Sequence, residues 1–195
     1  MPKEKTLIRF FAGVSAKPAT NIRIMKRILL ALGLILLVNL RIDAAPGKSK
    51  PGAGIQKLQS LAGDWTGKDE RGAVVKTSIK SIAGETAVME TLVMPGMEEM
   101  VTIYSQDGDG IALLHYCPTN NQPRMRAVLG PGDVKELVFA FEGAGNLDSP
   151  DEGHEHKLVI QFQDKDHMTE RWTWRSNGKD SEMVYRFERK NGRAK

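Results

Sequence analysis

Residues 156–175 read HKLVIQFQDKDHMTERWTWR, and this stretch decides the fold class. Its main apolar residues fall at every second position within each half: Leu158, Ile160, Phe162, Met168, Trp172 and Trp174. An apolar side chain at every second position is typical of a β-strand with one buried face and one wet face. The stretch therefore predicts two amphipathic strands, 156–163 and 167–175.

The same alternation runs from Gly63 onward, interrupted by short groups of turn residues. Asp107–Gly110 and Asn177-Gly178 are typical of hairpin turns, because Asn, Asp and Gly adopt positive φ at low cost. Together these signals predict ten consecutive strands, at 64–68, 73–82, 85–94, 98–106, 110–117, 124–129, 134–142, 156–163, 167–175 and 181–189.

Ten consecutive strands joined by short turns predict an all-β fold, an antiparallel up-and-down barrel. An open sheet would leave two exposed edges, and closure into a barrel removes them. A β-sandwich is the alternative, although it usually needs longer crossovers than these turns provide. A short N-terminal helix is expected at 55–61, where Ile55, Leu58 and Leu61 recur at a spacing of three.

An export signal is predicted in residues 1–45, with Met25 as an alternative start. Residues 26–45 read KRILLALGLILLVNLRIDAA, in which a basic pair precedes thirteen uncharged residues and small residues follow. The apolar run is shorter than the roughly 20 residues that span a bilayer. We therefore expect a periplasmic or secreted protein that meets a membrane only through this leader. Cleavage of the leader is favoured over a retained anchor.

The remaining chain divides by composition into a linker at 46–54 (PGKSKPGAG), a barrel at 55–190 and a short tail at 191–195. The chain has 28 basic and 24 acidic residues, of which eight basic and two acidic ones lie in 1–45. The remaining 20 basic and 22 acidic residues give the rest of the chain a net charge of −2. Such a domain has no basic surface for nucleic acid. The chain has one cysteine, Cys117, so no internal disulfide can form. We expect the domain to be a monomer or a dimer.

Residues 61–65 (LAGDW) resemble the Gly-x-Trp opening of lipocalin-like (calycin) barrels. In that family a short helix precedes the motif and an arginine on the last strand packs over the tryptophan, which implies Arg186 or Arg189 here. The segment from about 55 to 190 is similar to uncharacterised exported bacterial families related to nitrobindin-like barrels. Nitrobindin-like proteins hold haem through a late histidine, but His167 falls on the polar face of its strand, so haem binding is not carried over.

The densest group of polar residues is at 115–125 (HYCPTNNQPRM). His115 and Cys117 point to the same side of their strand, and if that side is inward they line one end of the barrel. Amides and an arginine in the following loop would then form hydrogen bonds at the rim, as in pockets that orient a ligand. The alternative is that His115 donates to a backbone carbonyl, that Cys117 is buried and inert, and that the loop side chains form hydrogen bonds only within their own turn.

Glu170 lies between Met168 and Trp172 on the apolar side of its strand. A buried carboxylate needs a partner, and three arginines are candidates: Arg124, Arg126 and Arg186. The alternative is a β-bulge that leaves Glu170 in solvent. The candidate ligand-binding residues are therefore His115, Cys117, Asn121, Gln122, Arg124, Glu170 and Trp172.

His154 and His156 have the chemistry of metal ligands, but an acidic loop with two histidines is more often only solvated, so no metal site is expected. The sequence names no cofactor and no catalytic residue. The preferred hypothesis is an exported barrel that binds a small apolar or amphipathic molecule in its interior. The candidate lining residues of that interior are Trp65, Phe139, Phe141, Phe162 and Trp172. The alternatives are an enzyme that uses 115–125 or Glu170, and a structural envelope-associated domain without a ligand.

Overall fold

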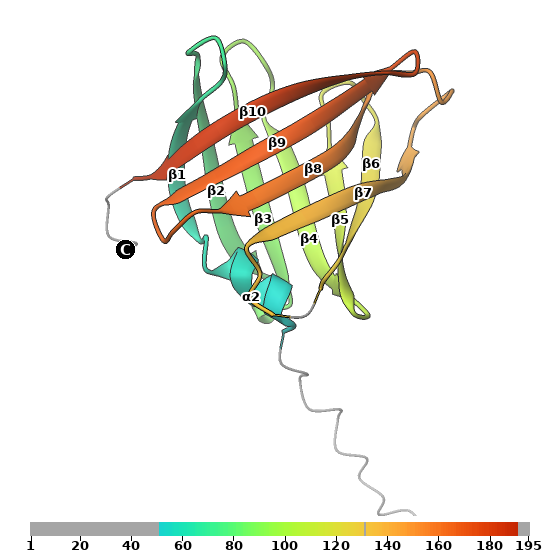
Figure 1. Ribbon diagram of the computed structural model, residues 1–195. Helices are drawn as coiled ribbons and strands as arrows, with labels where there is room; N and C mark the ends of the chain where they lie inside the picture. Colours follow the sequence, from blue (N-terminus) through green and yellow to red (C-terminus); the bar gives the residue numbers. More distant parts are fainter. Residues whose placement is uncertain (1–50, 131, 191–195) are drawn as a thin grey trace, which may run out of the picture. The chain divides into compact units, whose positions relative to one another are not determined.

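The computed structural model describes residues 51–130 and 132–190. The expectations for the leader, most of the linker and the tail lie outside the described residues. Ten antiparallel strands close into a barrel in chain order, with the last strand paired to the first (Figure 1). The predicted all-β up-and-down barrel with a short preceding helix is confirmed.

The elements are α2 (Ala53–Gln59), β1 (Gly63–Lys68), β2 (Val74–Ile82), the 3-10 turn η1 (Ala83–Glu85), β3 (Ala87–Val93), β4 (Met100–Asp107), β5 (Gly110–Tyr116), β6 (Gln122–Val128), β7 (Glu136–Gly145), β8 (His154–Phe162), β9 (His167–Ser176) and β10 (Lys179–Arg189).

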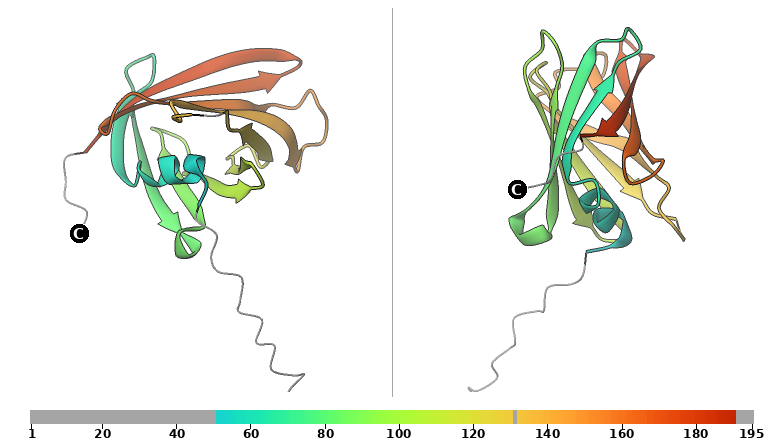
Figure 2. Two further views of the ribbon diagram at one scale, coloured as in Figure 1. Left: turned by 60° about the horizontal axis from the view of Figure 1, so that its bottom comes forward. Right: turned by 90° about the vertical axis from the view of Figure 1, so that its left-hand side faces the viewer.

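The helix α2 covers one end of the barrel (Figure 2, left). It begins two residues earlier than expected, at Ala53, and ends at Gln59. Ile55 and Leu58 are almost fully buried and belong to the same apolar cluster as the barrel core. Because its apolar face enters the barrel, tertiary packing rather than length stabilises this short helix.

Tight turns connect most strands, as the turn residues predict. Asn177 and Gly178 both have positive φ, 50° and 69°, which is the geometry of a type I′ hairpin between β9 and β10. The connection between β7 and β8 is shorter than expected and spans 146–153, because β7 continues to Gly145 and β8 begins at His154.

Two register shifts interrupt the alternation. One occurs where β6 pairs with β7, between Arg124 and Met125 of β6. The other occurs where β8 pairs with β9, between Glu155 and Lys157 of β8. A β-bulge adds a residue to one strand and turns the following side chains to the other face. The second shift allows both Glu155 and Leu158 to be buried.

Large side chains fill the middle of the barrel and the end near α2. The largest fully buried ones include Trp65, Tyr104, Phe139, Phe187, Ile111 and Leu113. This part of the interior is therefore a packed core. The opposite end, formed by the loops between β1 and β2, β3 and β4, and β5 and β6, contains the cavity described next.

Candidate functional site

A cavity of about 470 Å³ opens at the barrel end opposite α2, and we call it the mouth cavity. Its volume lies within the range of about 300–1,000 Å³ that is usual for small-molecule sites. Its walls are formed by Arg71, Leu92, Met94, Met97, Met100, His115, Cys117, Thr119, Glu155, Trp172, Trp174, Ser181, Glu182, Met183 and Tyr185.

The walls of the mouth cavity are mostly apolar and soft. Four of the lining residues are methionines, and three more are the aromatic residues Trp172, Trp174 and Tyr185. The Tyr185 hydroxyl lies 3.1 Å from the Met94 sulfur. Flexible thioethers adapt to varied apolar shapes, so these walls can fit a hydrocarbon surface.

His115 enters the cavity wall from β5, where it follows the buried residues Ile111 and Leu113 at every second position. Its Nδ1 lies 2.9 Å from the Thr102 hydroxyl, and its ring packs on Trp172 at a centroid distance of 4.8 Å. Its Nε2 is buried and has no partner among the described residues. Burial lowers the pKa of His115 to about 4, so the imidazole is neutral at neutral pH.

Glu155 reaches the cavity from β8, opposite Trp174 on β9. Its side chain is buried, and its Oε2 has no hydrogen-bond partner in the part of the chain that the structure describes. Desolvation by burial raises the pKa of Glu155 to about 8. The sequence analysis missed this residue because it falls just before the β8 bulge, within a segment that reads as an acidic loop.

Beneath the cavity, two glutamates lie in the core. Glu90 accepts hydrogen bonds from the Thr77 and Tyr104 hydroxyls, each at 2.7 Å. Glu170 is fully buried and accepts a hydrogen bond from the Trp172 indole at 3.0 Å, while its Oε1 has no partner within 51–130 and 132–190. Burial, and then the nearby Glu90 charge, holds the pKa of Glu170 well above its ordinary value.

Glu170 thus faces inward, and no bulge turns it to solvent. Its partner is the Trp172 indole rather than one of the three expected arginines. Arg126 instead bonds to Asp107 and Asp109 at the end near α2.

The structure brings some of the predicted ligand-binding residues together and separates others. His115, Cys117 and Trp172 line the mouth cavity, and Glu170 lies directly behind Trp172. The other three lie outside the lining: Asn121 is buried and donates to the Gly153 carbonyl at 2.8 Å, Gln122 donates to the Asn120 carbonyl at 3.1 Å, and Arg124 is exposed on β6. Ligand binding by these residues stays a prediction.

The Cys117 thiol is partly exposed at the cavity wall and accepts a hydrogen bond from the Thr119 hydroxyl at 3.0 Å. His115 bonds to Thr102 instead, and no hydrogen bond joins Cys117 to His115 in the described chain. A Cys–His catalytic pair needs such a contact or a close approach to it. The geometry therefore gives no support for nucleophilic chemistry at Cys117.

A second hollow, of about 340 Å³, lies beside the loop between β7 and β8. There the His154 Nε2 lies 3.1 Å from the His156 Nδ1, and the Phe141 ring lies against both imidazoles. No cluster of three or more His, Cys, Asp or Glu residues suited to a metal occurs in 51–130 and 132–190. Phe141 was expected in the barrel lining, but it packs in this hollow instead.

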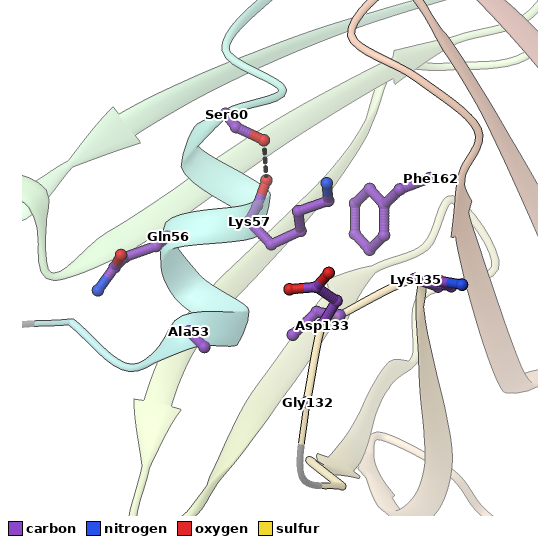
Figure 3. A pocket seen from close by; sticks show the side chains of 9 residues that line it. Ala53, Gln56, Lys57, Ser60, Gly132, Asp133, Lys135 and Phe162 are labelled. Carbon is purple, nitrogen blue, oxygen red and sulfur yellow. Dashed lines mark hydrogen bonds between the residues drawn. The ribbon is translucent and has the colours of Figure 1, made fainter.

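A third hollow, of about 520 Å³, lies beside α2 at the other end of the barrel (Figure 3). Lys57 extends from α2 over the Phe162 ring, with its Nζ 5.1 Å from the ring centre, and Asp133 lies nearby. None of the buried unpartnered polar atoms of the described residues belongs to its lining. The mouth cavity is therefore the stronger candidate for a binding site.

No family model matches the chain, and a search of curated proteins finds no significant match. Among the described residues, none of the helices is both long and apolar enough to cross a membrane.

Proposed function

We propose that this protein binds a small amphipathic molecule in the mouth cavity. The observation that carries the proposal is a pair of buried polar atoms without partners, His115 Nε2 and Glu155 Oε2, in the wall of a mostly apolar cavity. An unsatisfied buried polar group costs about 1–3 kcal/mol. A ligand that supplies the missing partners would recover part of this cost while its apolar part contacts the methionines.

This arrangement favours binding over catalysis. The polar atoms of the cavity are few and lie in apolar walls, as in sites that orient a ligand by a small number of hydrogen bonds. The one hydroxyl that His115 contacts, that of Thr102, is buried and does not line the cavity, so it is not presented to a bound molecule. The hypothesis of a structural domain without a ligand does not account for the two unpartnered atoms.

Filling the cavity tests the proposal. Leu92→Trp replaces a lining side chain with a larger one that fills part of the mouth cavity. Val138→Trp introduces the same residue on the exposed outer face of β7 and is the control. Calorimetric titration with octyltrimethylammonium, 1-octanol and octanoate should show binding of at least one of them to the unchanged protein. Binding should be retained in Val138→Trp and weakened at least about tenfold in Leu92→Trp. Equal binding by the two variants would place the ligand elsewhere.

We also infer a relationship to calycin barrels. Support comes from the order of a short helix, a Gly-x-Trp motif at Gly63 and Trp65, and Arg189 stacked over Trp65 from the last strand. A solved structure of a calycin that superposes on the barrel with α2 and this stack in equivalent places would support the relationship. A different strand order in the best superposition would argue against it.

Export remains a proposal that rests on the sequence of residues 26–45. The intact mass of protein recovered from its own source tests it. A chain that begins shortly after Ala44 or Ala45, outside the cytoplasm, would support export with cleavage. A full-length chain in the cytoplasm would contradict it.

A further inference from the structure

We propose that the mouth cavity selects organic cations, namely amphipathic amines or quaternary ammonium compounds. This inference rests on the proposed function and names the class of ligand. It is carried by the charges and the surfaces that surround the cavity.

Apart from histidine, the buried ionisable side chains of the barrel interior are acidic. The buried ionisable residues of the described chain include Glu90, Glu155 and Glu170, but no lysine or arginine. In the cavity wall, Glu155 is the one buried acidic residue, while the other charged lining residues, Arg71 and Glu182, are exposed. Glu182 also lies 3.8 Å from the Arg171 guanidinium. Binding surfaces usually match the sign of a ligand with an opposite potential, so this interior favours a cation over an anion.

Glu155 is the specific anchor for that cation. Its side-chain Oε2 has no hydrogen-bond partner within 51–130 and 132–190, and its side chain lies in the cavity wall. An isolated carboxylate in such a place is unfavourable unless an opposite charge neutralises it. A bound ammonium group would supply that charge, and the Glu155 carboxyl would release its proton as the cation binds.

The walls suit an alkylated ammonium better than a small inorganic ion. Trp172, Trp174 and Tyr185 line the same cavity as Glu155, and the negative faces of aromatic rings attract quaternary ammonium groups. Four methionine side chains provide an apolar surface for the remainder of the molecule. A small metal ion would find only one unpartnered carboxyl here, which is too few ligands to hold it.

Three probes with the same eight-carbon tail test the inference: octyltrimethylammonium, 1-octanol and octanoate. Titration calorimetry of the full chain at neutral pH should rank the cation first, at least about tenfold tighter than the alcohol, and the carboxylate last. If no probe binds, the proposed function itself is contradicted. If the alcohol or the carboxylate binds as tightly as the cation, the ligand-binding function stands and the selection of cations is refuted.

Glu155→Gln separates the charge from the shape of the site. This variant should bind octyltrimethylammonium about tenfold more weakly and should bind 1-octanol as the unchanged protein does. Glu142→Gln makes the same change on the exposed outer face of β7 and should leave all affinities unchanged. Undiminished binding of the cation by Glu155→Gln would overturn the role of Glu155. The ranking of the probes by the unchanged protein tests the inference even if this variant folds poorly.

Discussion

Arg189 stacks on Trp65, with its guanidinium carbon 4.1 Å from the centre of the indole ring. The two residues are cross-strand partners where β10 closes the barrel onto β1. The same guanidinium donates to the carbonyls of Ser60 at 3.1 Å and Ala62 at 2.7 Å, and the Trp65 indole donates to the Leu61 carbonyl at 2.8 Å. The pair therefore joins the last strand, the first strand and the segment that leaves α2.

Replacing Arg189 by lysine should lower the free energy of unfolding by about 1–3 kcal/mol. A lysine cannot stack as a plane on Trp65 and donate to several carbonyls at once. Urea unfolding followed by tryptophan fluorescence measures the loss. Arg186→Lys, on the exposed face of the same strand, should change stability by less than about 0.5 kcal/mol. Equal losses in the two variants would contradict the role given to the stack.

The helix α2 is expected to stabilise the barrel without contributing to the ligand site. Leu58→Ala removes a buried side chain and should cost about 2–5 kcal/mol of unfolding free energy. The affinity of the mouth cavity should stay the same, because α2 lies at the opposite end. Gln56→Ala, at an exposed position of the same helix, is the control and should have little effect on thermal unfolding. A variant Leu58→Ala that folds but loses ligand binding would show that the two ends are coupled.

The barrel could be predicted from the sequence because alternation and turn residues are local signals. The choice between Arg186 and Arg189 could not be made that way, since it depends on the register in which β10 meets β1. Trp65 was expected among lining residues, but the same register places it under Arg189. Long-range pairing, rather than local pattern, decides such contacts.

The candidate site was predictable only in part for a similar reason. The sequence left open whether His115 and Cys117 point into the barrel or away from it. In the structure both residues line the mouth cavity. Glu155 was missed because a bulge has no reliable signature in the alternation. Arg124 was placed at the rim, whereas β6 turns it outward.

The two core glutamates should respond differently to the same substitution. Glu170→Gln replaces a carboxyl whose charged form is disfavoured by burial with a neutral amide of similar shape, and it should change the unfolding free energy by less than about 1 kcal/mol at neutral pH. Glu90→Gln should cost about 1–3 kcal/mol of unfolding free energy. One carboxylate oxygen of Glu90 accepts from Thr77 and the other from Tyr104, and the amide nitrogen of glutamine cannot accept a hydrogen bond in place of either oxygen. Urea unfolding of both variants measures the difference. A larger loss for Glu170→Gln than for Glu90→Gln would contradict the roles given to the two carboxyl groups.

Cys117 provides a chemical report on the mouth cavity. Its thiol is partly exposed in the lining, so iodoacetamide should modify the folded protein, and a bound ligand should slow the reaction. Because the chain has one cysteine, the mass shift identifies the site, and Cys117→Ser is the blank. Saturating octyltrimethylammonium should lower the rate several-fold. An unchanged rate with bound ligand would place that ligand outside the cavity.

Stability should fall as the pH rises from 6.5 to 8. Burial raises the pKa of Glu155 from 4.5 to about 8, so between these values the folded state holds a proton that the unfolded state has lost. Unfolding free energy therefore decreases with pH in this window, by up to about 1.4 kcal/mol per unit for one group. Glu170, whose pKa is also raised, acts in the same direction. His115 acts in the opposite direction, but only between about pH 4 and 6.5.

Glu155→Gln isolates the contribution of Glu155. The amide does not titrate, so the slope of unfolding free energy against pH between 6.5 and 8 should be smaller than in the unchanged protein. The contribution of Glu170 to this slope should remain in the variant. The contribution of exposed groups such as His167 should be the same in both proteins and should cancel in their difference. Glu142→Gln should keep the full slope. A slope that Glu155→Gln leaves unchanged would contradict the raised pKa of Glu155.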